Sequence, residues 1–262
     1  MPHESTSRTL IIALGVCLVC SILVSTAAVS LHGKQETNKK VEKLKNILVA
    51  GDLLTDESNV EETFKEKVQT QIINLAAGQV VPKDKYTDEL NPDAFDIKTM
   101  ASDPEYGQAI PAKEDIAKIK RMPKFMPVYE VRKNNQVQKV ILPIYGKGLW
   151  STMYGFIALG KDLRTVEGFT FYEHGETPGL GGEVDNPRWK ALWKGKLAYD
   201  ENGNVAIKVI KGKVDKSSPN ARSEVDGLSG ATLTTRGVNN LVRFWLGADG
   251  YSSFLKKLRE EG

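Results

Sequence analysis

The chain has 262 residues, a formal net charge of +3 and 40% hydrophobic residues. This composition is typical of a folded protein with one or two domains, and the small, dispersed charge gives no support for nucleic-acid binding. The only two cysteines, Cys17 and Cys20, lie in an apolar N-terminal stretch, which excludes a disulfide framework for any domain that follows.

The apolar stretch runs from Leu10 to Leu31 without a charged residue, and as a helix it is long enough to cross a bilayer. A cleaved signal peptide is the alternative, because Ala27 and Ala28 are small residues near a potential cleavage site. The stretch is longer than a typical signal-peptide core, however. We therefore expect a retained transmembrane helix over residues 10–31, preceded by a short tail over residues 1–9.

Five lysines follow the stretch, whereas Arg8 is the only lysine or arginine before it. The positive-inside rule would leave the large C-terminal part in the cytoplasm, although large domains translocate largely regardless of flanking charge. In the same segment an apolar stripe at helical spacing predicts that the helix continues beyond the membrane. The lysines are Lys34, Lys39, Lys40, Lys43 and Lys45, and the stripe is Val41, Leu44, Ile47 and Leu48.

Residues 32–125 are expected to form a helical and loop-rich connecting region. Ser58 and Glu61 have capping-box spacing, and the apolar positions that follow predict a helix that ends at Gly78. Prolines make the next stretch irregular, and a short helix is expected over residues 114–120. The apolar positions are Val60, Phe64, Val68, Ile72 and Leu75.

From Val128 onward the apolar period changes to two, which predicts strands. Residues 128–132 and 137–144 form one expected hairpin around Asn134 and Asn135, residues 155–159 and 165–172 a second, and residues 197–199 and 205–210 a third. Helices are expected over residues 187–193, with Asn186 as the cap, and over residues 235–246, with Gly247 as a left-handed C-cap. Residues 126–262 are therefore predicted to be an α+β domain with a mainly antiparallel sheet.

A cluster of small and hydroxyl residues lies at the start of the last of these helices, in the stretch Asp226-Gly227-Leu228-Ser229-Gly230-Ala231-Thr232-Leu233-Thr234-Thr235. Unpaired N–H groups and the helix dipole make such a helix N-terminus suited to a phosphate, and Gly230 would allow close approach to the backbone. The alternative is a turn followed by an N-cap supplied by Thr234 or Thr235.

A second glycine-rich stretch, His174-Gly175-Glu176-Thr177-Pro178-Gly179-Leu180-Gly181-Gly182, ends a predicted strand. It is either a wide loop that leads to Asn186, or a loop lying against a flat ligand, with Leu180 packed on one face. A third stretch places Trp150 and Ser151 among small residues, where the indole could stack on a ligand or fill the core. We assign no catalytic or metal-binding residue, since His174 is the only histidine beyond the apolar stretch and its end.

The pattern Asp226-x-x-Ser229-Gly230-Ala231-Thr232 matches the one at which flavin transferases attach FMN to proteins. Together with the Glu176-Thr177-Pro178-Gly179-Leu180-Gly181 run and the Gly146-x-Gly148-x-Trp150 segment, it makes the part after Val128 resemble a covalent FMN-binding domain. The anchor, the connecting region and the C-terminal stretch from Tyr251 to Leu258 most resemble the NqrC family, whose members belong to the Na+-translocating NADH:quinone reductase. The related flavin carrier of Rnf-type ferredoxin:NAD+ complexes is typically shorter between anchor and domain.

The resemblance implies one FMN per chain, joined by a phosphoester to Thr232, in an electron relay coupled within the complex to quinone reduction and sodium export. It implies partners in the other subunits, a flavin transferase during maturation, and an inner-membrane location with the FMN domain on the periplasmic side, against the lysine distribution. An Rnf-type electron carrier and a membrane-anchored protein that binds FMN without a covalent bond, or only serves as a scaffold, are the alternatives. The cofactor-binding residues that it implies are Thr232, Asp226, Ser229, Gly230, Ala231, Thr234, Thr235, Glu176, Thr177, Gly179, Leu180, Gly181, Trp150 and Ser151.

Overall fold

The computed structural model describes residues 5–54, 59–134 and 136–261. It divides into two compact units, Met1–Lys43 and Leu44–Gly262. Within the described part of the first unit the chain forms helix α1 (Thr6–Ala50), whose last turns belong to the second unit. By its length and its exposed apolar surface α1 could span a membrane. The expected helix and its continuation are present, although the helix begins at Thr6, within the expected tail, and its retention as a transmembrane helix stays a prediction.

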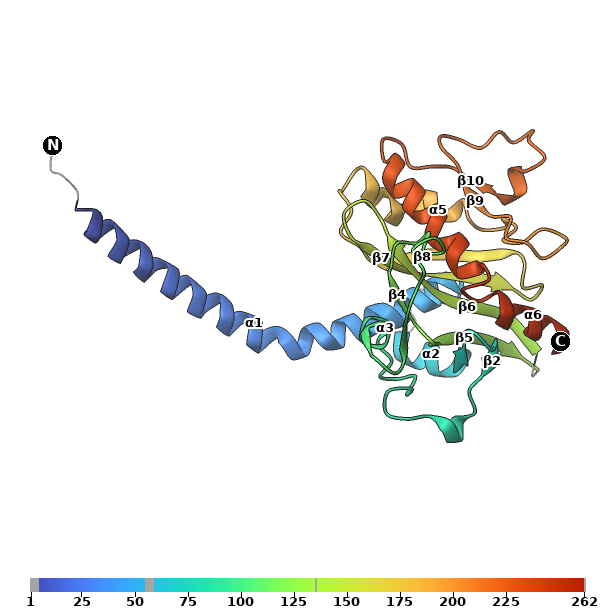
Figure 1. Cartoon of the computed structure of the whole chain (residues 1–262), viewed down its shortest axis with the longest axis horizontal. Helices are drawn as coiled ribbons and strands as arrows, with labels where there is room; N and C mark the ends of the chain where they lie inside the picture. Colours follow the sequence, from blue (N-terminus) through green and yellow to red (C-terminus); the bar gives the residue numbers. More distant parts are fainter. Residues whose placement is uncertain (1–4, 55–58, 135, 262) are drawn as a thin grey trace. The chain divides into compact units, whose positions relative to one another are not determined.

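The second unit is built on a six-stranded antiparallel sheet in the order β2-β1-β5-β6-β7-β8 (Figure 1). β6 lies inside the sheet and pairs with β5 on one side and with β7 along the whole length of β7 on the other. The predicted α+β class is therefore confirmed. The strands are β1 (Gln69–Asn74), β2 (Gln79–Val80), β5 (Phe125–Lys133), β6 (Gln136–Lys147), β7 (Thr152–Gly160) and β8 (Val166–Glu173).

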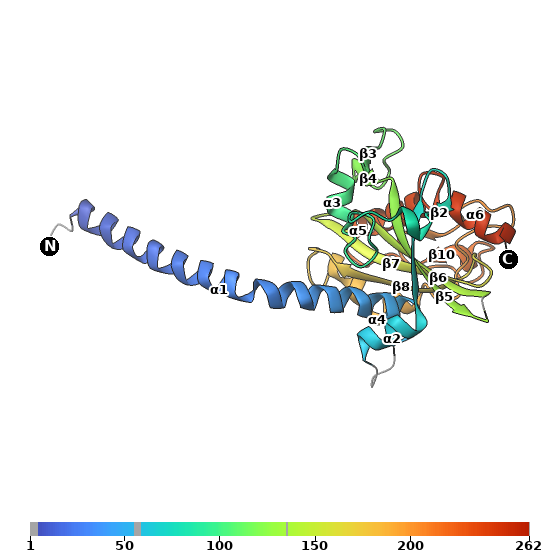
Figure 2. The same cartoon turned by 90° about the horizontal axis from the view of Figure 1, so that it is seen from below.

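Figure 2 shows helices on both sides of the sheet, and the side chains that alternate along β6 belong to two different hydrophobic cores. Leu142 and Ile144 pack in the same cluster as Trp245 of helix α5 (Thr232–Leu246), whereas Ile141 packs in a second cluster with Ile47 of α1. Because successive strand residues face opposite sides, α5 and the end of α1 cover opposite faces of the sheet.

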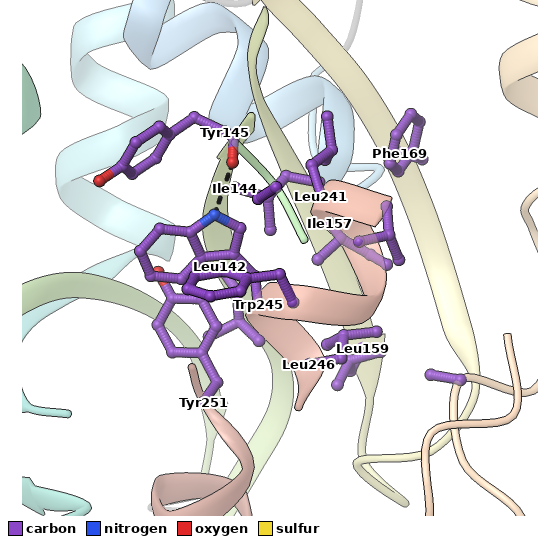
Figure 3. Packing of buried hydrophobic residues seen from close by; sticks show 14 of the residues in the cluster. Leu142, Ile144, Tyr145, Ile157, Leu159, Phe169, Leu241, Trp245, Leu246 and Tyr251 are labelled. Atoms are coloured by element: carbon purple, nitrogen blue, oxygen red, sulfur yellow. Dashed lines mark hydrogen bonds between the residues drawn. The ribbon is translucent and has the colours of Figure 1, made fainter. Parts of the chain in front are cut away.

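Trp245, in the last turns of α5, is fully buried and makes the central contact of the larger core (Figure 3). Its indole N–H donates to the Tyr145 carbonyl at 2.7 Å, and its ring lies 5.5 Å from that of Tyr251. The Tyr251 hydroxyl donates to the Pro143 carbonyl at 2.7 Å. These contacts fix the helix on the sheet and so determine where its N-terminus emerges.

The remaining elements are short and lie around the sheet. β9 and β10 pair in parallel beside α5, and α4, which Asn186 caps as expected, packs near β8. Their bounds are α2 (Val60–Lys67), α3 (Ile97–Ser102), β3 (Gly107–Ala109), β4 (Arg121–Pro123), α4 (Pro187–Ala191), β9 (Lys208–Val209), β10 (Glu224–Val225) and α6 (Ser252–Glu261), with 3₁₀ turns at Lys83–Lys85, Gly181–Asp185 and Ala221–Ser223.

The predicted helix up to Gly78 is wrong in its second half. α2 ends at Lys67, and the following residues form β1, which pairs with β5 from Gln69 to Asn74. Apolar positions at spacings of three and four continue into β1, but pairing with β5 and the full burial of Ile72 and Ile73 in the core override the helical period. Ser58 lies outside the described residues, and Asn59 caps α2 by accepting from the Glu61 N–H at 3.2 Å.

Three further local predictions are wrong. Residues 114–120 form turns, in which the Asp115 carboxylate accepts from the Ile119 and Lys120 N–H groups. The third hairpin is reduced to a single bridge between Tyr199 and Val205, and β9 pairs with β10 instead. Gly247 has φ −82° and ψ −170°, an extended and not a left-handed cap.

The first two hairpins are confirmed as β5–β6 and β7–β8, except that Asn135 lies outside the described residues. The unit Leu44–Gly262 includes most of the predicted connecting region as well as the whole predicted FMN-binding domain. A division between these two regions at residue 126 stays a prediction.

Candidate functional site

The N-terminus of α5 is exposed and retains unused hydrogen-bonding capacity. Thr232 is its first residue, and the cap position, Ala231, supplies no side-chain acceptor. Among the described residues, no acceptor binds the N–H groups of Thr232, Leu233 or Thr234. Three free N–H groups at the positive end of a helix are suited to an anion, as the sequence predicts.

The four hydroxyl residues of the motif divide into two pairs. Thr234 donates to the Glu176 carboxylate at 2.6 Å, and the Thr235 hydroxyl accepts from the Leu228 N–H at 3.0 Å; both side chains are buried. Ser229 and Thr232 are exposed, and within the described chain their hydroxyls make no hydrogen bond. The alternative in which Thr234 or Thr235 is the N-cap is wrong, because the helix begins before them.

Asp226, which opens the motif, is directed into the protein. Its carboxylate accepts from the Val214 N–H at 2.9 Å, and its carbonyl accepts from the Trp189 indole at 2.8 Å. Gly227 donates to the Gly212 carbonyl at 2.8 Å. In the structure Asp226 thus holds the motif onto a neighbouring loop, and contact with a ligand stays a prediction.

The loop after β8 approaches the motif directly. Gly230 has φ +73°, and a Cβ there would lie 3.3 Å from Leu180 Cδ2, so a side chain would crowd this approach. The Thr177 carbonyl accepts from the N–H groups of Leu180 and Gly182, which closes the loop into a compact turn that includes Gly179 at φ +75°.

The loop between β6 and β7 is the third segment at this site. The Ser151 hydroxyl accepts from the Gly175 N–H at 2.6 Å, which joins this loop to the one after β8. The Trp150 side chain is 65% exposed, so it does not fill the core. The three stretches that the sequence singles out are thus neighbours in space.

The segments that meet at this site carry exposed apolar side chains. Leu180 is 47% exposed and Leu233 is 53% exposed, and Leu149 and Trp150 on the β6–β7 loop are also exposed. Sequence reasoning missed Leu149 and Leu233. Leu233 could have been found, because it lies off the apolar stripe that Val238 and the following turns of α5 bury.

His174 lies at the edge of the site and is bonded on both sides of its ring. Its Nε2 lies 2.6 Å from the Asp185 carboxylate, and its Nδ1 accepts from the Glu176 N–H at 3.2 Å. The hydrogen bond to Asp185 raises the pKa of His174, although burial opposes the shift. These bonds give the histidine a structural role. No cluster of metal-ligating side chains occurs in the part of the chain that the structure describes.

Comparison with known proteins gives a consistent assignment. Residues 148–247 match the family described as the FMN-binding domain. The chain is 48% identical, over 98% of both chains, to the NqrC protein of the Na(+)-translocating NADH-quinone reductase of Pseudomonas aeruginosa. It is 42% identical to the corresponding protein of Yersinia pestis over 98% of this chain and 95% of that one.

Two solved structures share the fold. The NqrC crystal structure from Shewanella oneidensis superimposes with a TM-score of 0.76 and 36% identity, covering 86% of this chain and 99% of that one. The NqrC protein of the Na(+)-translocating NADH-quinone reductase from Parabacteroides distasonis gives a TM-score of 0.63 and 27% identity, covering 86% and 96%. Thr232 and the residues around it therefore belong to a chain whose fold these two solved structures share.

Proposed function

The chain belongs to the NqrC family of the Na(+)-translocating NADH-quinone reductase, an oxidoreductase complex, and from this premise we propose that it carries FMN as a phosphoester on Thr232. As a single-pass protein of the inner membrane it relays electrons through this FMN. Within the complex, with the other subunits as partners, the relay is coupled to quinone reduction and sodium export.

One observation carries the choice of Thr232. It is the exposed threonine of the motif Asp226–Thr235, its hydroxyl is unbonded within the described chain, and it stands where three N–H groups of α5 have no acceptor. Thr234 and Thr235 use their hydroxyls in buried hydrogen bonds. A phosphodiester on Thr232 would place its charge at the helix N-terminus, where the dipole and the free N–H groups stabilise it.

The residues around Thr232 fit a flat, mostly apolar ring system joined to a phosphate. Trp150, Leu180 and Leu233 expose apolar surface that a ring could cover, and the free N–H groups would bind the phosphate. Bound FMN would supply the electron-transfer chemistry. The chain itself tethers the cofactor, orients it and excludes part of the solvent.

Attachment requires an enzyme other than this chain. Forming the bond between the Thr232 oxygen and phosphorus releases the hydroxyl proton, and in the described residues no base is hydrogen-bonded to that hydroxyl. We propose that a flavin transferase supplies the base that takes up this proton and an activated flavin dinucleotide. Its phosphoanhydride bond breaks as the Thr232 phosphoester forms, and the other nucleoside monophosphate leaves. The exposed position of Thr232 leaves it accessible to such a partner.

The test is co-expression of the full chain with an active flavin transferase, followed by denaturing electrophoresis, in-gel flavin fluorescence and intact mass. Wild type should carry one FMN, and Thr232→Ala should carry none while remaining folded. Thr232→Ser is the matched control, because it keeps a hydroxyl at this position and should retain some FMN attachment. A dark wild-type band would support non-covalent binding or a scaffold role instead.

The FMN-bearing unit is proposed to face the periplasm. The lysines at residues 34–45 oppose this orientation, but a large domain can be translocated against flanking charge. A reporter active only in the periplasm, fused after Gly262, should be active; activity of a cytoplasmic reporter at the same position would reverse the assignment.

A further inference from the structure

Glu176 is a buried carboxylate at the junction of the three site segments. It is 5% exposed, and its two oxygens accept four hydrogen bonds from other parts of the chain. Three come from the backbone of the β6–β7 loop, and the fourth comes from the first turn of α5. The donors are the N–H groups of Leu149 (3.1 Å), Trp150 (2.9 Å) and Ser151 (3.3 Å) and the hydroxyl of Thr234 (2.6 Å).

The carboxylate is held in its charged form. Burial alone would raise the pKa of Glu176, but the hydrogen bonds from Thr234 and from the three backbone N–H groups outweigh it and lower that pKa. Each donor stabilises the anion more than the neutral acid. Near neutral pH the group is therefore a fixed negative acceptor with no hydroxyl of its own to donate.

The surrounding backbone is shaped to admit this carboxylate. A Cβ on Gly148 would lie 2.5 Å from Glu176 Oε1, and a Cβ on Gly181 would lie 2.9 Å from Oε2 and 2.6 Å from the Thr234 hydroxyl. Neither glycine has a positive φ, so the close approach of the carboxylate, and not backbone strain, explains why a glycine stands at each position.

We propose that Glu176 is a positioning residue. It fixes the exposed Trp150 loop relative to the Thr232 end of α5, so that both can contact one flavin, and it does not touch that flavin itself. The inference rests on the proposed function and deepens it. The family resemblance groups Glu176 with the cofactor-binding residues, but both of its oxygens are turned toward the protein. Its effect on the cofactor is exerted through Trp150, on the loop, and through Thr232, two residues before Thr234 on α5.

Glu176→Gln is the direct test, because it keeps the shape and removes the charge. The amide NH2 cannot accept, so it loses the two backbone bonds from Trp150 and Ser151 if it takes the Oε1 position. At the Oε2 position it loses the bond from Leu149, although the Thr234 hydroxyl can turn to accept from it. With a limiting amount of flavin transferase, we expect the initial rate of FMN attachment to fall by about tenfold, within the factor of about 100 that a misplacement of about 1 Å can cost. Thr234→Val should act in the same direction, and Thr234→Ser, which keeps the hydroxyl, should restore most of the rate.

Asp162→Asn provides a matched control at the opposite end of β7. The Asp162 carboxylate accepts from the N–H groups of Arg164 and Thr165 and from the Thr165 hydroxyl at 2.6 Å, so it ties a turn in the same chemical way. Its substitution should lower the melting temperature but leave attachment at the wild-type rate.

A readout without flavin keeps the inference separate from the proposed function. The full chain in detergent, labelled with 5-fluorotryptophan, should give a ¹⁹F resonance for Trp150 that Trp150→Phe identifies. Glu176→Gln should shift or broaden this resonance and leave that of the buried Trp245 in place, whereas Asp162→Asn should leave both unchanged.

The outcomes distinguish the two proposals. Slow attachment together with a perturbed Trp150 resonance in Glu176→Gln, and neither in Asp162→Asn, would support the positioning role. An unperturbed Trp150 resonance, or attachment that slows equally in Asp162→Asn, would overturn it. If wild type takes up no FMN, the proposed function fails, and the Trp150 resonance still decides whether Glu176 orders the loop.

Discussion

The two ends of helix α5 differ in whether their polar groups are bonded within the protein. At the C-terminal end Trp245 is fully buried, its indole N–H is bonded to Tyr145, and its ring packs against Tyr251. At the N-terminal end the hydroxyl of Thr232 and three backbone N–H groups have no partner in the described chain, and Leu233 is exposed. One end satisfies its polar groups within the protein, and the other leaves them available.

The difference shows how the fold supports an exposed site. Unsatisfied N–H groups cost little where water reaches them, but the end of a helix frays unless something holds it. Here the packed half of α5 and the buried bonds of Thr234 and Thr235 hold the helix, so Thr232 can stay exposed and still be well placed. Substitutions at the two ends should therefore have separable effects on stability and on attachment.

Trp245→Ala should give the largest loss of stability. Removing a fully buried indole leaves a cavity and an unsatisfied Tyr145 carbonyl, for which we expect a loss of about 3–5 kcal/mol in unfolding free energy. Chemical denaturation of the full chain in detergent measures it. Trp245→Phe, which keeps a ring, should lose less; equal losses in both variants would show that the cavity is not the cause.

Thr235→Val should have an intermediate effect. The valine fills the same volume but leaves the buried Leu228 N–H without its acceptor, which costs about 1–3 kcal/mol. Because this bond ties the motif to the helix, attachment of FMN should also slow. Thr235→Ser, which retains the hydroxyl, is the control, and its failure to preserve stability would assign the effect to the lost methyl group.

Acid should remove the contribution of Glu176. Because its pKa is lowered in the folded chain, the carboxylate stabilises the fold above its unfolded pKa of about 4.3, and this stabilisation is lost as the pH falls through the lower folded pKa. The difference in unfolding free energy between wild type and Glu176→Gln should be constant from about pH 7 to about pH 5 and shrink below that. A difference that grows in acid would contradict this.

Ser229→Ala should have the smallest effect. The side chain is exposed and makes no hydrogen bond in the described chain, so stability should stay within about 0.5 kcal/mol of wild type. Chemical denaturation of the full chain in detergent measures it. A larger loss would show that the Ser229 side chain has a partner in the folded chain.

Local patterns predicted much of the architecture. The uncharged apolar run, the amphipathic stripe of α5 and the period-two strands of the first two hairpins all appear where expected. Prediction failed where a segment's partner is distant in sequence: β1 completes the sheet beside β5 although the spacing of its apolar residues favours a helix. The strand with which such a segment pairs determines its secondary structure, and the local spacing of apolar residues does not reveal that partner.

The sequence by itself determined that a hydroxyl-rich motif precedes a helix, that two further loops resemble those of FMN-binding domains, and that an apolar helix comes first. Only the tertiary structure decided which hydroxyls remain available and which acidic side chains face inward. Thr234 is bonded to Glu176, 58 positions away in the sequence, and Asp226 is bonded to a separate loop. Such hydrogen bonds depend on how the sheet and α5 bring distant segments together, and they leave no periodic or spacing signal in the chain.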